Sequence, residues 1–286
     1  MASRLATLLK PRIVALLVFV ALAAAFLGAD GTPDLVSLVW LALTGSMAAG
    51  GAGALNHYLE RDLDARMERT RQRPLVLGGM AEARLVLGLG LALVGFAAAM
   101  TLPFNAAQGV FLLAGAFVYV VVYTMWLKRR SPWNIVIGGL AGSCAVLTGW
   151  ATVGPWFALQ PLLLALLLFL WTPPHFWSLA IVHLDDYRRA SVPMLPVAVG
   201  TRTAALWGLL HVVLLVGVSF ALAETATFGT IYRVVALAVA AALIGTALRQ
   251  VWLADRESAR LHFGASILYL AAIFTAMGVD RYVQSS

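Results

Sequence analysis

Long apolar runs dominate the chain, and short polar segments separate them. A helix that crosses a bilayer needs about 20 mostly apolar residues, because no water is available there to satisfy backbone groups. The runs predict nine membrane-spanning helices, whose ends we place to within several residues. They lie at 13–27, 35–55, 85–102, 107–126, 134–153, 159–182, 204–223, 232–252 and 263–279. The sequence therefore predicts an all-α, polytopic membrane protein, with a single transmembrane domain over residues 1–286.

Composition supports this interpretation and excludes several others. The chain is 62% hydrophobic and only 12% charged, whereas soluble domains carry about a quarter charged residues. Its net charge is +7, but basic residues that flank membrane spans usually set orientation and contact lipid headgroups. We therefore expect the lipid bilayer, and no nucleic acid, as a partner. The single cysteine, Cys144, excludes an internal disulfide. The basic start leads into a span without a clear cleavage site, so we expect no removable signal peptide.

The basic residues gather on one side of the predicted spans. The connectors at 28–34, 103–106, 154–158 and 224–230 contain no Lys or Arg. Only Arg233 and Arg281 fall on that side, so 20 minus 2 leaves 18 of the 20 basic residues on the other. The positive-inside rule then places the N-terminus and the long loops in the cytoplasm. Nine spans in a cell (inner) membrane place the C-terminus on the opposite face.

The stretch 56–75, which follows the second span, has an unusual density of charge: four acidic and five basic residues. If the span continues as a helix, Asn56, Glu60 and Asp64 lie on one face and Asp62 points the other way. An amide and two carboxylates at this spacing can hold Mg²⁺, a cation that takes oxygen ligands and often shares them with phosphates. A solvated helix extension paired with nearby arginines is an equally good interpretation of the spacing alone.

A second acidic loop follows the sixth span. Asp185 and Asp186 are adjacent there, and adjacent carboxylates repel each other unless a cation lies between them. With the first loop they could form two acidic walls, each holding a metal against one diphosphate. The alternative is a cap on the following span, paired with Arg188 and Arg189.

Basic residues at the inner end of the fourth span are candidates for phosphate binding. Lys128 and Arg129 lie there, although orientation alone could explain them. Fixed positive charge in a water-poor site assists the departure of a phosphate group. Arg69 and Arg73, four residues apart in the first loop, are rival candidates for this role.

His175 lies inside the sixth span, in the sequence W-T-P-P-H-F-W. The two prolines are expected to bend the helix and free backbone carbonyls, which is tolerated where a helix lines a cavity. An intramembrane histidine is a functional candidate by default. His175 could ligate a metal or haem iron, or donate a hydrogen bond; satisfying the freed carbonyls is an equally good explanation.

Four blocks give the chain a resemblance to a known family: N-H-Y-L-E-R-D-L-D-A-R-M-E-R-T-R-Q-R-P-L, L-K-R-R-S-P-W-N, W-T-P-P-H-F-W-S-L-A and D-D-Y-R-R-A-S-V-P-M-L-P-V. They resemble the signature blocks of the haem O synthases, the protohaem IX farnesyltransferases of the UbiA-type intramembrane prenyltransferase superfamily. The opening L-L-K-P-R-I is similar as well, and the resemblance runs from residue 5 to about 280. It implies nine transmembrane helices around a central cavity that opens to the cytoplasmic side.

The resemblance also implies a reaction and its residues. Farnesyl diphosphate and haem B would be the substrates, haem O and diphosphate the products, and Mg²⁺ the cofactor. A haem A synthase or a terminal oxidase is the implied partner. The residues that correspond to the family's sites are Asn56, Glu60, Asp64, Asp185 and Asp186 for metal and catalysis, and Lys128, Arg129, Arg69 and Arg73 for diphosphate. His175 and Tyr123 are candidates for haem contact that the resemblance does not itself assign.

Two positions depart from the pattern of the superfamily. Position 60 is Glu where the pattern has Asp, which retains the charge but adds a methylene. In the second loop no aspartate follows four residues after Asp185, because position 189 is Arg. Which aspartate of the doublet binds metal is therefore open.

Two other functions compete with this interpretation. The first is a related prenyltransferase that acts on an aromatic quinone or chlorophyll precursor; the blocks P-P-H-F-W and D-Y-R-R-A-S-V-P-M-L-P argue against it. The second is a membrane transporter or haem-delivery protein. Transporters usually keep ionisable residues near mid-membrane, whereas here the acids gather at one face.

Overall fold

The computed structural model describes residues 7–29, 32–225 and 228–285, and this part of the chain contains helices and no strands. Nine of its helices are long and apolar enough to cross a membrane, which confirms the predicted fold class. They are α2 (Pro11–Gly28), α3 (Leu35–Asp64), α5 (Met80–Thr101), the run of α6 (Ala106–Phe117), η1 (Val118–Trp126) and η2 (Leu127–Arg129), the run of α7 (Asn134–Gly138) and α8 (Leu140–Ala151), α9 (Leu159–Val182), α12 (Thr201–Thr225), α13 (Thr230–Leu253) and α14 (Arg256–Ser285). Arg4 of the basic start, and residues 30–31 and 226–227 of two predicted connectors, lie outside the described residues.

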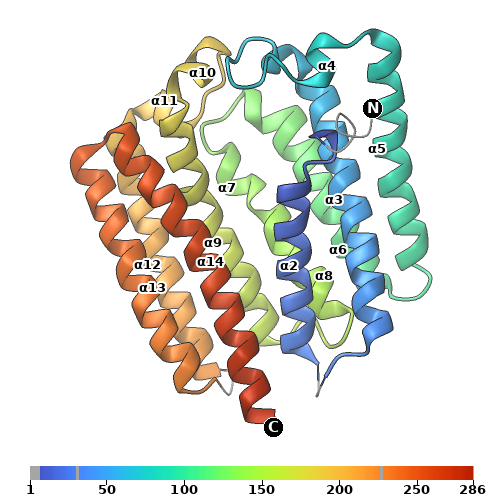
Figure 1. Cartoon of the computed structure of the whole chain (residues 1–286), viewed down its shortest axis with the longest axis vertical. Helices are drawn as coiled ribbons and strands as arrows, with labels where there is room; N and C mark the ends of the chain where they lie inside the picture. Colours follow the sequence, from blue (N-terminus) through green and yellow to red (C-terminus); the bar gives the residue numbers. More distant parts are fainter. Residues whose placement is uncertain (1–6, 30–31, 226–227, 286) are drawn as a thin grey trace.

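Three short helices lie at one end of the helical bundle. They are α4 (Pro74–Leu77), α10 (Leu184–Arg189) and α11 (Leu195–Val199). The described start of the chain lies toward this end, and the C-terminus lies at the opposite end (Figure 1). The two acidic loops predicted from the sequence are therefore on the same side of the bundle.

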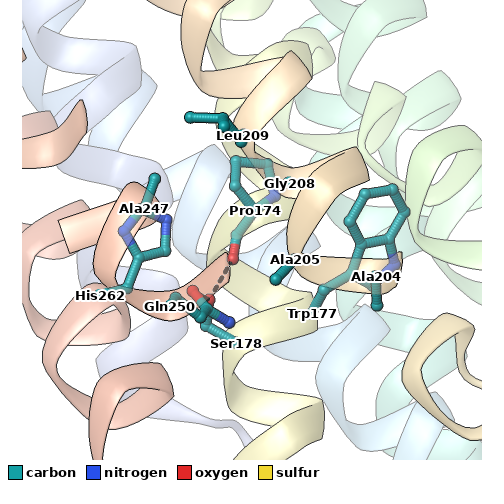
Figure 2. Close-up of a pocket in the computed structure, with 10 residues that line it drawn as sticks. All are labelled: Pro174, Trp177, Ser178, Ala204, Ala205, Gly208, Leu209, Ala247, Gln250 and His262. Atoms are coloured by element: carbon teal, nitrogen blue, oxygen red, sulfur yellow. Dashed lines mark hydrogen bonds between the residues drawn. The ribbon is translucent and has the colours of Figure 1, made fainter. Parts of the chain in front are cut away.

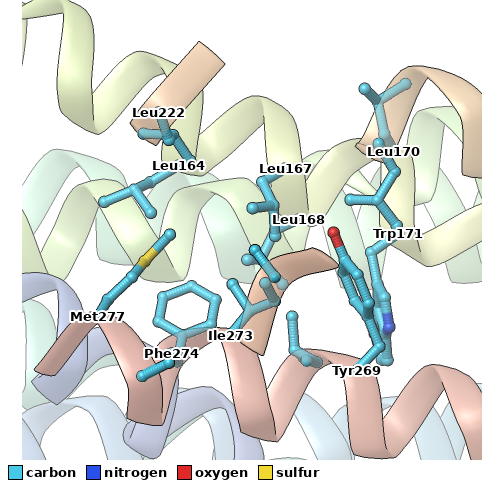
Figure 3. Close-up of a cluster of buried hydrophobic side chains, with 14 of the residues drawn as sticks. Leu164, Leu167, Leu168, Leu170, Trp171, Leu222, Tyr269, Ile273, Phe274 and Met277 are labelled. Atoms are coloured by element: carbon cyan, nitrogen blue, oxygen red, sulfur yellow. The ribbon is translucent and has the colours of Figure 1, made fainter. Parts of the chain in front are cut away.

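The largest cluster of buried apolar side chains joins α9, α12, α13 and α14, with a contribution from α2 and α8 (Figure 3). Hydrogen bonds also cross this cluster: Trp171 Nε1 donates to the carbonyl of Ser266 at 2.7 Å, Tyr232 Oη donates to that of Ser219 at 2.7 Å, and the hydroxyls of Ser219 and Tyr269 contact each other. In lipid, apolar burial alone does not drive helices together, so close packing and buried hydrogen bonds must do so. These contacts pack α9 against α12, α13 and α14.

Helix α3 continues well beyond the apolar run that predicted it. Asp34 caps its start, and the Asp34 carboxylate accepts hydrogen bonds from the backbone N–H groups of Val36 and Ser37 at 3.0 and 2.9 Å. The helix is thirty residues long and ends only at Asp64. Asn56, Glu60 and Asp64 therefore lie on one continuous helix, as their spacing predicted.

Helices α2 and α8 approach each other at Gly149. A Cβ added there would overlap the backbone carbonyl of Ala21. Small residues allow membrane helices to pack backbone to backbone. This contact holds α2, and with it the segment that precedes α2, close to the middle of the bundle.

Gly149→Ala should therefore destabilise the protein, because the added methyl group forces α2 away from α8. Overpacking of this kind costs about 1–3 kcal/mol, which a lower midpoint of thermal unfolding in detergent would report. Gly245→Ala is the matched control, since a Cβ on this α13 glycine meets nothing within 4 Å. Equal midpoints for the two variants would contradict the close packing of α2 on α8.

Candidate functional site

A buried polar cluster lies along one face of α3, at the end of the helix near α4. Its centre consists of Asn56, Glu60 and Asp64, which are 1%, 4% and 3% exposed. Glu60 contacts the ammonium of Lys128, and the amide oxygen of Asn56 contacts that of Lys10. Both carboxylate oxygens of Asp64 accept from Arg73 Nη1, at 2.9 and 2.8 Å. Each oxygen-bearing side chain thus faces a cation from a different segment of the chain.

Lys10 is a site residue that the sequence analysis did not identify. Its ammonium also donates to the hydroxyl of Tyr119 at 2.9 Å. Burial lowers the pKa of Lys10 to about 7, an effect that the charges of Arg73 and Lys128 reinforce and that Glu60 opposes. An amine in these surroundings remains fully charged only beside additional negative charge. In the sequence, Lys10 looked like one of several basic residues that set membrane orientation.

The segment that contains Lys10 reaches the cluster because α3 has glycines where the two meet. A Cβ on Gly53 would lie 3.4 Å from the carbonyl of Leu9 and 3.5 Å from Cγ of Lys10. The backbone of Lys10 is in the left-handed region, with φ of 52°. This turn directs the chain into α2 while the side chain enters the cluster.

The end of the fourth span forms the facing wall of the site. Its segment η1 is a π-helix, which no sequence pattern indicated. Asn56 Nδ2 donates to the hydroxyl of Thr124 at 2.9 Å. The rings of Tyr119 and Tyr123 stack with centroids 5.9 Å apart, and Lys128 Nζ lies 5.6 Å from the Tyr123 centroid. Tyr123, a sequence-predicted haem contact, therefore lies directly beside the Lys128–Glu60 pair.

Lys128 and Arg129 point in different directions although they are adjacent. Arg129 makes two hydrogen bonds of 2.7 Å to Asp62, and both side chains are exposed. Arg129 also donates to the carbonyl of Leu59 at 3.1 Å. Of the two, only Lys128 enters the cluster, while Asp62 faces away from it as the helical spacing predicted.

Asp186 connects the second loop to the first. It accepts from the backbone N–H groups of Glu68 and Arg69 at 3.0 and 3.3 Å, and it contacts the guanidinium of Arg189. Burial opposes ionisation, but these hydrogen bonds outweigh it and lower the pKa of the Asp186 carboxyl. The structure thus brings Asp186 to the first loop through backbone groups, and Arg69 takes part with its N–H.

Asp185 has different surroundings from its neighbour. It is exposed and contacts Arg256 at the start of α14, with Arg188 at 3.9 Å. The arginine-paired arrangement that the sequence analysis raised as an alternative is thus present at both aspartates. The structure does not join them to Glu60 and Asp64 in one cluster: within the described residues, no group of three His, Cys, Asp or Glu could hold a metal.

The donor set along α3 nevertheless fits a hard divalent cation. It offers one amide oxygen and two carboxylates, the ligand types that Mg²⁺ takes with the remaining positions filled by water or phosphate. The buried Nδ1 of His57 has no hydrogen-bond partner in the described structure, so the cluster has unsatisfied polar capacity. Lys10, Lys128 and Arg73 contact the donor oxygens, and a metal would replace them there.

His175 lies between two aromatic rings. Its ring centroid is 4.2 Å from that of Trp171 and 4.5 Å from that of Phe263, with nearly parallel planes. Nδ1 lies 2.8 Å from the hydroxyl of Ser266 on α14. The hydrogen-bond partner is therefore a side chain on another helix and not a carbonyl freed by the prolines, and α9 continues through Pro173 and Pro174.

Two cavities lie away from the carboxylates. One, of about 10 Å³, lies among α9, α12, α13 and α14, where the Ser178 hydroxyl can donate its one proton either to the carbonyl of Pro174, at 2.7 Å, or to Oε1 of Gln250, at 3.0 Å (Figure 2). The other is an apolar groove of about 650 Å³ between α2, α3 and α14. Neither is lined by a carboxylate of the α3 cluster.

Removing one partner of the buried Lys128–Glu60 pair should lower the free energy of unfolding much more than removing both partners together. Lys128→Met leaves a buried carboxylate uncompensated, which costs about 3–5 kcal/mol, whereas Arg129→Gln breaks an exposed pair worth about 0–1 kcal/mol. Thermal unfolding of the ligand-free protein in detergent measures both. Combining Lys128→Met with Glu60→Gln should restore most of the loss, and a double variant no more stable than Lys128→Met would contradict the pairing.

Comparison with known proteins identifies the family. The UbiA prenyltransferase family matches residues 17–274. The chain is 43% identical over 279 residues to protoheme IX farnesyltransferase 1 of Paramagnetospirillum magneticum, covering 96% of this chain and 97% of that one. It is 40% identical over 277 residues to the protoheme IX farnesyltransferase of Thermus thermophilus, covering 96% of this chain but only 45% of that longer protein.

Solved structures share the fold at low sequence identity. A structure of digeranylgeranylglyceryl phosphate synthase has a TM-score of 0.81 at 14% identity, over 98% of both chains. A UbiA homolog from Archaeoglobus fulgidus bound to DMAPP and Mg²⁺ has a TM-score of 0.63 at 16% identity, over 96% of this chain and 99% of that one. Fold and sequence agree with the resemblance found in the four signature blocks, and the chain belongs to the UbiA prenyltransferase family.

Proposed function

We propose that this protein is a protohaem IX farnesyltransferase. It transfers the farnesyl group of farnesyl diphosphate to a vinyl group of haem B. The allylic C–O bond breaks and its electron pair leaves with diphosphate, while the terminal vinyl carbon forms the new C–C bond. Water then adds to the other vinyl carbon and loses a proton, which gives haem O. The acceptor follows from the relatives named protoheme IX farnesyltransferase, which span nearly all of this chain.

The diphosphate site rests on one observation: three cations converge on three buried oxygen-bearing side chains. Lys10, Arg73 and Lys128 come from the first segment, the first loop and the fourth span. Lys128 is buried, Lys10 and Arg73 are half-buried, and charged side chains in a membrane bundle are usually functional. Three cations around one helix face form a site for a diphosphate group, and in a water-poor site they stabilise its departure.

Mg²⁺ would be held by Asn56, Glu60 and Asp64, and when bound it supplies neutralisation of charge on the leaving diphosphate. The structure of the Archaeoglobus fulgidus homolog bound to DMAPP and Mg²⁺ supports a Mg²⁺ requirement. The additional methylene of Glu60 lets its carboxylate reach Lys128 from a helix position where the superfamily has aspartate. The cations displaced from these oxygens then bind the phosphate oxygens.

The other predicted residues take different roles in this proposal. Asp186 holds the two loops together, and it would have to release Glu68 and Arg69 to reach a metal. Asp185 could bind a metal from the second loop only if Arg256 moved away from it. Arg69 is exposed beside Asp186 and could contact diphosphate at the cytoplasmic opening of the proposed site. Arg129 instead forms an ion pair with Asp62.

Haem B would bind between the halves of the bundle, in a central cavity that opens toward the acidic loops. His175 and Tyr123 are the proposed contacts. His175 stacks between the rings of Trp171 and Phe263, and Tyr123 lies beside Lys128 at the diphosphate end. A macrocycle held there would present a vinyl group to the allylic carbon while lipid and protein exclude bulk water.

The membrane orientation follows from charge. The loops rich in Lys and Arg lie at one end of the bundle (Figure 1), and we place that end and the N-terminus in the cytoplasm and the C-terminus on the opposite face. The site then takes farnesyl diphosphate from the cytoplasmic side of a cell membrane. Haem O would pass to a haem A synthase or a terminal oxidase.

The reaction can be tested directly. Membranes that contain the protein, supplied with haem B, farnesyl diphosphate and Mg²⁺, should form a heavier and more hydrophobic haem, detected by chromatography and mass spectrometry. Chelation of Mg²⁺ should stop product formation. If prenylated quinone precursors form instead when their acceptors are supplied, the acceptor assignment is wrong; if haem is bound but unchanged, a delivery function replaces it.

Two aspartates two residues apart provide a matched test of the metal site. Asp64→Asn removes a buried carboxylate from the cluster and should lower turnover by on the order of 10²-fold or more. Asp62→Asn alters an exposed residue on the other side of α3 and should change turnover by less than about threefold. Similar losses for both variants, at equal amounts of inserted protein, would contradict the assigned face.

A further inference from the structure

The fourth span presents residues to the site that an α-helix would separate. Tyr119 contacts Lys10, and Lys128 contacts Glu60, yet the two residues are nine positions apart. In an α-helix of 3.6 residues per turn, nine residues make about two and a half turns and point in opposite directions. Something between Tyr119 and Lys128 must correct this phase.

The π-helical segment η1, Val118–Trp126, makes the correction. In a π-helix the hydrogen bonds run from residue i to i+5, so each turn holds more than four residues; at the end of η1 the N–H of Leu127 is shared between the carbonyls of Val122 and Tyr123. From Tyr119 to Trp126 the chain therefore turns less per residue than an α-helix does, and the 3₁₀ segment η2 carries it on to Lys128. Tyr119, Thr124 and Lys128 all contact residues of the α3 site as a result. Such segments are rare and are found mostly at functional sites.

Thr124 connects the π-helix to the proposed metal site. Its hydroxyl has one proton, which it donates to the carbonyl of Tyr119 five residues earlier, at 2.8 Å. It therefore meets Asn56 as an acceptor, and Asn56 Nδ2 donates to it at 2.9 Å. The charged form of Lys10 has only donors, and it donates to the oxygen of the same amide. Both contacts orient the Asn56 amide with its oxygen toward the cations and its nitrogen toward η1.

We infer that η1 sets the register of the fourth span, bringing Lys128 to Glu60, and that Thr124 is a positioning residue for Asn56. Thr124 is 1% exposed and lies behind the amide rather than in the place of a ligand. The inference rests on the proposed function only in taking Asn56 as a metal ligand. It adds a residue and a backbone conformation on which the metal and diphosphate sites depend.

Substitution of Thr124 tests the positioning role. Thr124→Val retains the shape but removes both hydrogen bonds, and Thr124→Ser retains the hydroxyl. The readout is Mg²⁺-dependent binding of farnesyl diphosphate without haem, by calorimetry, so that no turnover is needed. Thr124→Val should weaken the apparent Mg²⁺ affinity by about 10- to 100-fold, as outer-shell changes do. Thr124→Ser should stay within about threefold of the wild type.

The same proteins separate a positioning effect from loss of structure. Thermal unfolding without ligands gives the fraction of each variant that is unfolded. The inference requires that Thr124→Val lose more Mg²⁺ affinity than this unfolded fraction accounts for. Unchanged Mg²⁺ affinity in Thr124→Val, or an equal loss in Thr124→Ser, overturns the role of Thr124. A wild-type protein that binds farnesyl diphosphate but makes no new haem would overturn the proposed acceptor and leave this inference standing.

Deletion of one residue tests the register. Val121 is exposed in η1, and its removal should return the segment to α-helical hydrogen bonding and rotate Lys128 by about 100° relative to Tyr119. Binding of farnesyl diphosphate should fall at least tenfold. Val121→Ala, which retains the chain length, should bind as the wild type does. Wild-type binding by the deletion variant would overturn the register argument; if that variant fails to insert, the Thr124 pair decides.

Discussion

The buried ion pair between Lys128 and Glu60 is the interaction on which the rest of the site depends. Charge in a membrane bundle is tolerated only when it is paired, so every charged group in the cluster fixes the position of another. Asp64 requires Arg73 from the first loop, and Asn56 and Lys10 meet across the start of α2. Three features of the fold bring these groups together: the extension of α3, the packing of α2 on Gly149, and the wider helical turn at η1.

The pattern of hydrophobic residues was sufficient to predict the membrane-spanning helices. A bilayer requires about 20 apolar residues per span, so the number and order of the spans follow from the chain, and α9 has the bounds that its apolar run predicts. The shared face of Asn56, Glu60 and Asp64 was also predictable, because α3 retains its period past the apolar run. The same period correctly placed Asp62 on the outside, where it pairs with Arg129.

The remaining site could not be predicted, for physical reasons. Lys10 is distant in sequence and reaches Asn56 only through tertiary packing against the glycines of α3. No local pattern distinguishes a π-helix from an α-helix in an apolar run, so the shared direction of Tyr119 and Lys128 was hidden. Asp186 was expected beside metal, but backbone N–H groups of the facing loop satisfy it, and sequence spacing contains no information on such backbone partners.

The central claim is that the cluster on α3 binds a prenyl diphosphate through Mg²⁺. A structure with a non-reactive farnesyl diphosphate analogue and Mg²⁺ tests it most directly. The account predicts a metal about 2.0–2.1 Å from oxygens of Asn56, Glu60 and Asp64, with the ammonium groups of Lys10 and Lys128 turned to the diphosphate. A metal bound only by Asp185 and Asp186, with Lys128 still on Glu60, would contradict it.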